Sequence, residues 1–173
     1  VDKPWTLALT GKKVLVVHPF DQSIHSQYLK REVLFENKNI LPNFELITLR
    51  AVQSVAGAKT PYKDWFEALK YMEDKISNID FDICILGCGA YGLPLAAHVK
   101  RIGKKAVHLG GGTQLLFGIK GKRWVEQYEK TLQYRPNESI NTNYIDLFND
   151  SWVYPDATEK PSDAVKVENA CYW

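Results

Sequence analysis

Short apolar runs alternate with amphipathic segments along most of this chain, and this alternation limits its possible folds more than any other feature. The apolar runs predict strands at 14–17, 44–49, 81–86 and 105–109. Helices are expected at 23–35, 62–79, 93–102 and 124–132, with a further short one at 142–148. Strands that alternate with helices form a parallel sheet covered on both faces. The sequence therefore predicts an α/β fold, a Rossmann-like three-layer sandwich whose mainly parallel sheet has about four or five strands.

The expected helix at 62–79 shows the clearest helical spacing, because Trp65, Leu69, Met72 and Ile76 recur on one face. We expect residues 1–150 to form one Rossmann-like domain. Residues 151–173 contain two prolines and, between Pro155 and Val165, few apolar residues, and they predict an irregular tail that wraps the same domain. Its possible anchors are Val167, Tyr172 and Trp173.

Charge, hydropathy and cysteine content limit the partners and the compartment. The net charge of +2 is too small to indicate a nucleic-acid partner. No apolar run approaches the ~20 residues of a membrane span. The three cysteines include no CxxC pair, which favours a reducing, cytoplasmic location. Cys84 and Cys88 have no further ligands at zinc-like spacing, so no metal site is predicted from them. Oligomerisation is compatible with the sequence.

The segment 83–125 contains no Asp or Glu but is rich in Lys and Arg, and it holds two glycine clusters. Gly87-Cys88-Gly89-Ala90-Tyr91-Gly92 follows one expected strand, and Gly110-Gly111-Gly112-Thr113-Gln114 follows the next. Glycines at strand ends let backbone N–H groups approach a ligand closely, and a helix that begins there favours negative charge. This segment therefore predicts a site for a phosphorylated small molecule, most simply a nucleotide or nucleotide-sugar.

The first cluster spells G-x-G-x-x-G, a pattern that also occurs in dinucleotide-binding proteins. That pattern is completed by an acidic residue about 20 positions further on, which holds the ribose hydroxyls. Here three glycines, 110–112, occupy that place. Binding of NAD or FAD, and with it the function of an NAD-linked oxidoreductase, therefore stays an alternative. A purely structural role, in which the glycines allow the strand and the helix to pack tightly, is another.

The second cluster predicts a backbone nest for a phosphate or sugar, with Thr113 and Gln114 as hydrogen-bonding groups; a flexible turn is the alternative. The glycine-spaced loop that follows carries Lys120 and Arg123, which could close over an anion or form a solvated turn. His18 ends the first expected strand and is the one catalytic candidate, as a general base or as a donor to a diphosphate. A structural role for it is the alternative.

The predicted contacts with the ligand follow from these motifs and from the ends of the expected strands. They are His18, Phe20, Gly87, Gly89, Tyr91, Gly92, Gly110, Gly111, Gly112, Thr113, Gln114, Lys120 and Arg123.

Two blocks of sequence resemble a known family. They are GKKVLVVHPF at 11–20, and DICILGCGAYGLPLA at 82–96 together with GKKAVHLG at 103–110. Together they resemble the C-terminal half of GT-D-type glycosyltransferase domains, which occur among proteins of surface-polysaccharide and glycoprotein assembly. The resemblance covers residues 9–124, and much of it is shared by Rossmann-like sheets in general.

The resemblance implies a transferase of polysaccharide biosynthesis that binds a nucleotide-sugar, with Mn²⁺ or Mg²⁺ as a companion, and transfers the sugar to an acceptor hydroxyl. It places His18, Gly87, Gly89, Tyr91, Gly110 and Gly112 around the donor. The acidic motif of the family would lie upstream of Val1, so this chain would carry mainly the nucleotide side. The alternatives are a non-catalytic nucleotide or sugar-phosphate binding module, and an interaction domain that docks through Cys171-Tyr172-Trp173.

Overall fold

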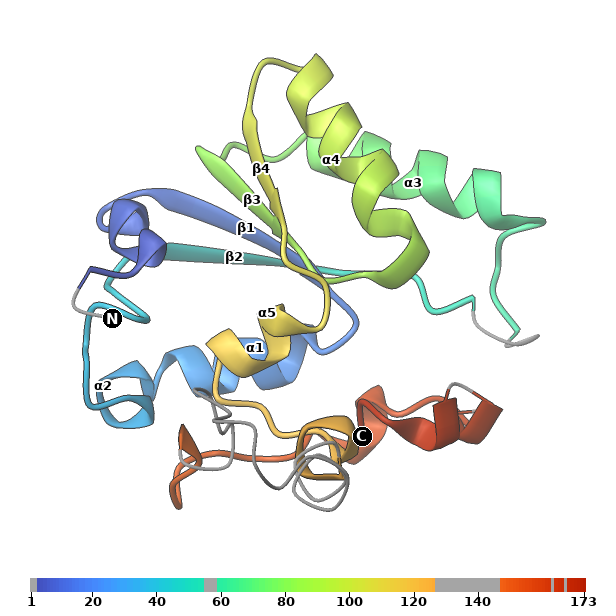
Figure 1. Cartoon of the computed structure of the whole chain (residues 1–173). Coiled ribbons are helices and arrows are strands. Elements are labelled where there is room, and N and C mark those ends of the chain that lie inside the picture. The colour runs from blue at the N-terminus through green and yellow to red at the C-terminus, as the bar shows by residue number, and fades with distance from the viewer. Residues whose placement is uncertain (1–2, 55–58, 127–146, 163, 167) are drawn as a thin grey trace, which may run out of the picture.

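A four-stranded parallel sheet forms the centre of the protein (Figure 1). The computed structural model describes residues 3–54, 59–126, 147–162, 164–166 and 168–173. The strands are β1 (Lys13–His18), β2 (Glu45–Arg50), β3 (Ile83–Leu86) and β4 (Lys105–His108). They lie in the order β2-β1-β3-β4, and every neighbouring pair is parallel. The sheet confirms the predicted Rossmann-like α/β class.

Helices cover both faces of the sheet (Figure 1). One face carries α1 (Asp21–Tyr28), α2 (Arg31–Leu34) and α5 (Gly112–Leu116), and the other carries α3 (Trp65–Ser77) and α4 (Gly92–Arg101). The short 3-10 helices are η1 (Trp5–Leu9), η3 (Gly89–Tyr91), η5 (Ala157–Glu159), η6 (Ala164–Lys166) and η7 (Glu168–Ala170). None of the helices in the described ranges has the length and apolar composition that crossing a bilayer requires.

The position of β1 in the middle of the sheet explains why its sequence is continuously apolar. Val14 and Val16 pack into the cluster beneath α1, whereas Leu15 and Val17 pack into the cluster beneath α3 and α4. All four side chains are fully buried. Because successive side chains of a strand point to opposite faces, a strand covered on both faces needs an apolar residue at every position.

The prediction of one helix at 23–35 is wrong, because the chain forms α1 and α2 with a break between them. Ile24 and Tyr28 of α1 are buried, and the next buried position is Leu34. A continuous helix would place residues 31 and 32 above Tyr28, and both are charged. Because the chain changes direction between α1 and α2, Leu34 packs into the core, and the charged residues 31 and 32 do not.

Helix α4 agrees with its prediction in both capping features. Pro94 lies in the first turn, where the backbone N–H groups have no partner within the helix, so the N–H that proline lacks costs no hydrogen bond. Gly103 follows the helix with φ of 79°, the left-handed conformation that glycine adopts most easily. Part of the helix predicted at 124–132, most of that predicted at 142–148, and Val167 lie outside the described residues.

The C-terminal tail is fastened to the start of α1 by a buried carboxylate. Glu159 is 3% exposed, and its Oε1 accepts hydrogen bonds from the backbone N–H groups of Gln22 at 2.8 Å and Ser23 at 3.2 Å. Its Oε2 also accepts from the hydroxyl of Ser23. A carboxylate that accepts free N–H groups at a helix N-terminus is stabilised by charge as well as by hydrogen bonds.

We expect Glu159→Gln to lower the free energy of unfolding by about 1–3 kcal/mol, because the neutral amide replaces one of two accepting oxygens. Urea denaturation measures the change. Glu36→Gln is the matched control, since Glu36 is exposed and should change stability by less than about 0.5 kcal/mol. Equal stability of the two variants would contradict a structural role for the buried carboxylate.

Candidate functional site

A pocket opens at the carboxyl ends of β1 and β3, and its volume is about 440 Å³. Strand β2 pairs with one edge of β1, and β3, the next strand in the chain, pairs with the other edge of β1. Such a switch point is where parallel sheets bind ligands, and the volume is ordinary for a small-molecule site. The described residues that line the pocket are His18, Pro19, Phe20, Val52, Gln53, Ser54, Trp65, Gly87, Cys88, Gly89, Ala90, Tyr91, Gly110, Gly111, Gln114, Tyr172 and Trp173.

The pocket brings together most of the residues predicted as ligand contacts. Those that line it are His18, Phe20, Gly87, Gly89, Tyr91, Gly110, Gly111 and Gln114. Gly92, Gly112, Thr113, Lys120 and Arg123 are not among the lining residues. The two glycine clusters and the end of β1, separate in sequence, therefore form one wall.

Three segments that were not predicted as ligand contacts also line the pocket. Val52, Gln53 and Ser54 follow β2, and Trp65 begins α3. Tyr172 and Trp173 reach the pocket from the C-terminal tail, where the sequence predicted anchors of the fold. The loop after β2 could have been found from its place at a strand end, whereas nothing in the local sequence of the tail marks where it folds back.

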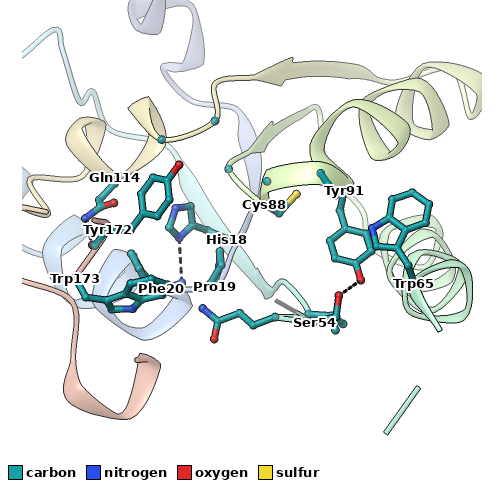
Figure 2. A pocket seen from close by; sticks show the side chains of 17 residues that line it. His18, Pro19, Phe20, Ser54, Trp65, Cys88, Tyr91, Gln114, Tyr172 and Trp173 are labelled. Carbon is teal, nitrogen blue, oxygen red and sulfur yellow. Dashed lines mark hydrogen bonds between the residues drawn. The ribbon is translucent and has the colours of Figure 1, made fainter. Parts of the chain in front are cut away.

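His18 lies at the floor of the pocket and is 4% exposed. Its Nδ1 accepts a hydrogen bond from the backbone N–H of Phe20 at 3.0 Å, so the proton of the neutral ring lies on Nε2 (Figure 2). Burial lowers the pKa of His18 to about 3, because a buried charge is poorly solvated. At neutral pH this side chain is an uncharged hydrogen-bond donor through Nε2.

Gly87 allows the end of β3 to pass very close to His18. A Cβ atom at this position would lie 2.5 Å from His18 Cδ2 and 2.6 Å from Thr113 Oγ1. Both neighbours are buried, and Thr113 Oγ1 has no hydrogen-bond partner within the described structure. Gly87 is therefore required by packing at the pocket floor, independently of any conformational freedom.

One end of the pocket carries a stacked pair of aromatic rings. Trp65 and Tyr91 lie parallel, with centroids 5.0 Å apart and planes inclined by 6°. The hydroxyls of Tyr91 and Ser54 are hydrogen-bonded (Figure 2). This arrangement fixes the tyrosine ring at the edge of the pocket.

The other end is formed by Phe20, Gln114 and the tail residues Tyr172 and Trp173 (Figure 2). Phe20 and Trp173 meet edge to face, with ring centroids 5.8 Å apart. Gln114 is fully buried, and its Nε2 donates to the backbone carbonyl of Tyr172 at 2.9 Å. Figure 2 shows this group on the opposite side of His18 from Trp65 and Tyr91.

The two basic residues predicted to clamp a phosphate lie beside aromatic rings. Arg123 donates to the hydroxyl of Tyr172 at 2.8 Å, and its guanidinium carbon lies 5.0 Å from the centre of that ring. Lys120 places its Nζ 5.7 Å from the ring centre of Phe148. Arg123 thus supports the pocket wall from behind, through Tyr172.

Backbone N–H groups of the first glycine cluster are available as donors. Within the described structure, no protein acceptor is found for the N–H groups of Gly89 and Ala90, which precede α4. Gly89 has a φ of 55°, the left-handed region in which a side chain would be strained. Backbone donors ahead of a helix favour negatively charged oxygen atoms.

The pocket lining in the described ranges contains no Asp, Glu, Lys or Arg. Burial raises the pKa of the Cys88 thiol to about 12, so this thiol stays protonated at neutral pH and is a poor nucleophile. Among the described residues there is no group of three or more His, Cys, Asp or Glu side chains that could hold a metal ion.

No protein-family model, curated protein or solved structure shows significant similarity to this chain.

Proposed function

We propose that the switch-point pocket binds the nucleotide-sugar donor of a glycosyltransferase. The observation that supports this most is a set of donors without a protein acceptor in the described structure, on residues that line the pocket: the N–H groups of Gly89 and Ala90 and the Nε2–H of His18. A diphosphate is held by hydrogen-bond donors, and preorganised neutral donors stabilise anionic oxygen effectively. The resemblance of residues 9–124 to glycosyltransferase domains leads to the same ligand.

The aromatic ends of the pocket suit the remaining parts of such a ligand. Trp65 and Tyr91 are stacked at one end, and Phe20 and Trp173 meet edge to face at the other. Aromatic faces pack well against sugar rings and nucleobases, both of which are flat or have an apolar face. The central donors would then hold the diphosphate that joins the two ends.

The proposed reaction transfers the sugar to an acceptor hydroxyl. The acceptor oxygen attacks the anomeric carbon, and the bond from that carbon to the diphosphate oxygen breaks. The nucleoside diphosphate leaves with the electron pair, and the acceptor gives its proton to a base. Stabilising the negative charge on the departing oxygen accelerates this step.

His18 fits the role of donor to the departing diphosphate better than the role of base. Its Nδ1 is engaged by the N–H of Phe20, its Nε2 carries the proton, and its pKa of about 3 makes it a weak base at neutral pH. The described pocket lining offers no carboxylate as a base, and a Mn²⁺ or Mg²⁺ ion that accompanies the donor would need ligands from outside that lining.

The same state of His18 favours a second candidate, a module that binds a nucleotide-sugar without turning it over. A neutral imidazole whose Nδ1 is engaged can donate its Nε2–H to a diphosphate without taking a proton. The two candidates are distinguished by prolonged incubation with a nucleotide-sugar and a sugar acceptor: a transferase releases the nucleoside diphosphate, whereas a binding module leaves the donor intact.

Calorimetric titration tests the proposal for either candidate. The purified chain is titrated with UDP- and GDP-sugars and with the free diphosphates, each with and without Mn²⁺. We expect saturable heat for at least one of them at or below millimolar concentration. No heat from any of these ligands at millimolar concentration would refute the proposed function.

A further inference from the structure

Gln114 has an amide whose orientation is fixed by the protein. Its Nε2 donates to the backbone carbonyls of Lys120 at 2.6 Å and Tyr172 at 2.9 Å. Turning the amide by half a rotation would place Oε1 against both carbonyl oxygens, and three acceptors cannot bond to one another. The side chain is therefore committed to presenting Oε1, an acceptor, on its other side.

That acceptor has no partner, and a donor at the same end of the pocket has none either. Gln114 Oε1 and Trp173 Nε1 are both buried without a hydrogen-bond partner within the described structure. Both residues line the pocket, next to Phe20 and Tyr172 (Figure 2). Buried polar groups are nearly always paired, and leaving one unpaired costs free energy. An unpaired acceptor and an unpaired donor in one pocket wall point to a ligand that supplies both complements.

The unpaired acceptor Gln114 Oε1 excludes the phosphate part of a ligand from this end of the pocket. Phosphate oxygens of a diphosphate ester accept hydrogen bonds and cannot donate one to Gln114 Oε1. An apolar group would leave both protein atoms unpaired. A flat ring with an N–H beside a carbonyl oxygen supplies a donor and an acceptor, and it packs against the rings of Phe20 and Trp173.

We infer that Gln114 selects the nucleobase of the ligand by accepting a hydrogen bond from a ring N–H, as in the N–H and C=O edge of uracil or guanine. This inference rests on the proposed function. Trp173 Nε1 donates to the adjacent carbonyl of the base, and the diphosphate extends toward the N–H groups of Gly89 and Ala90. Because Gln114 Oε1 and Trp173 Nε1 are both covered, the base reaches them after a side chain of the pocket wall shifts.

Base-methylated nucleotides test this inference on the unchanged protein. UDP is compared with 3-methyl-UDP, which lacks the ring N–H, and with 5-methyl-UDP, which has the same added volume but keeps the N–H. GDP is compared with 1-methyl-GDP in the same way. For the nucleotide that binds, we expect loss of the N–H to weaken binding about tenfold or more, since Oε1 stays unpaired. The 5-methyl analogue should bind within about threefold of UDP.

A variant assigns the effect to Gln114. In Gln114→Met, which has similar volume and no acceptor oxygen, the N-methyl penalty should fall below about threefold. Gln22→Met is the matched control, because Gln22 is exposed on α1 and the penalty should stay unchanged. If Gln114→Met fails to fold, the comparison of the two methylated nucleotides on the unchanged protein still decides.

The outcomes separate this inference from the proposed function. Binding of UDP or GDP that is unaffected by N-methylation would overturn the role of Gln114 and leave the nucleotide site standing. An N-methyl penalty of equal size in Gln114→Met would also overturn it. Absence of binding by every nucleotide would refute both statements together.

Discussion

Gly87→Ala should be among the most disruptive single-methyl additions to this protein. We expect the free energy of unfolding to fall by about 1–3 kcal/mol, because the new Cβ meets the buried side chains of His18 and Thr113. Since His18 also forms the pocket floor, nucleotide binding should weaken together with stability. Urea denaturation and calorimetric titration measure the two effects.

Gly92→Ala is the matched control for this prediction. Its Cβ would lie even closer to a side chain, 2.2 Å from His108 Nε2, but His108 is exposed and can swing away. Alanine is also preferred over glycine within a helix, and Gly92 is the first residue of α4. We expect little loss of stability from Gly92→Ala. A larger loss than that of Gly87→Ala would show that the pocket floor is not packed as described.

Acidification should destabilise the protein through His18. The folded protein holds the pKa of His18 at about 3, against about 6.5 in an unfolded chain. Between these values the unfolded state binds a proton that the folded state does not, so stability falls as the pH falls. The contribution of His18 to the free energy of unfolding is fully present above about pH 6.5. It is lost as the pH falls toward about 3, at up to about 1.4 kcal/mol per pH unit.

His18→Gln isolates this contribution from the other groups that titrate in acid. The glutamine carbonyl oxygen can accept the N–H of Phe20 in place of Nδ1, and glutamine does not titrate. We therefore expect the stability of the variant, measured by urea denaturation from pH 7 to pH 4, to fall less steeply than that of the natural protein. Parallel pH profiles would show that His18 is not held neutral by the fold.

Local patterns predicted the layers because each layer depends on neighbours close in the sequence. The continuous apolar run of β1 and the helical spacing of Trp65, Leu69 and Met72 reflect burial on two faces and on one face, respectively. The break between α1 and α2 escaped prediction, because it depends on which side chains fit beneath β1. Periodicity alone gave no account of that fit.

The lining of the pocket was predicted in part, for a physical reason. Gly87, Gly89, Gly110 and Gly111 follow strands directly, so parallel topology brings them to one edge of the sheet. The tail does not follow this rule. The bond from Gln114 to the carbonyl of Tyr172 joins residues 58 positions apart, and no local pattern encodes it.

The central claim is that a nucleotide occupies the pocket between the ends of β1 and β3. Titration of isotopically labelled protein with UDP and GDP, followed by amide NMR, tests it most directly. We predict saturable shifts that are largest for the amides of Gly89, Ala90 and Gly111, with shifts of the Trp65 and Trp173 side-chain N–H groups. Shifts that cluster away from these residues, or no shifts at millimolar nucleotide, would contradict the claim.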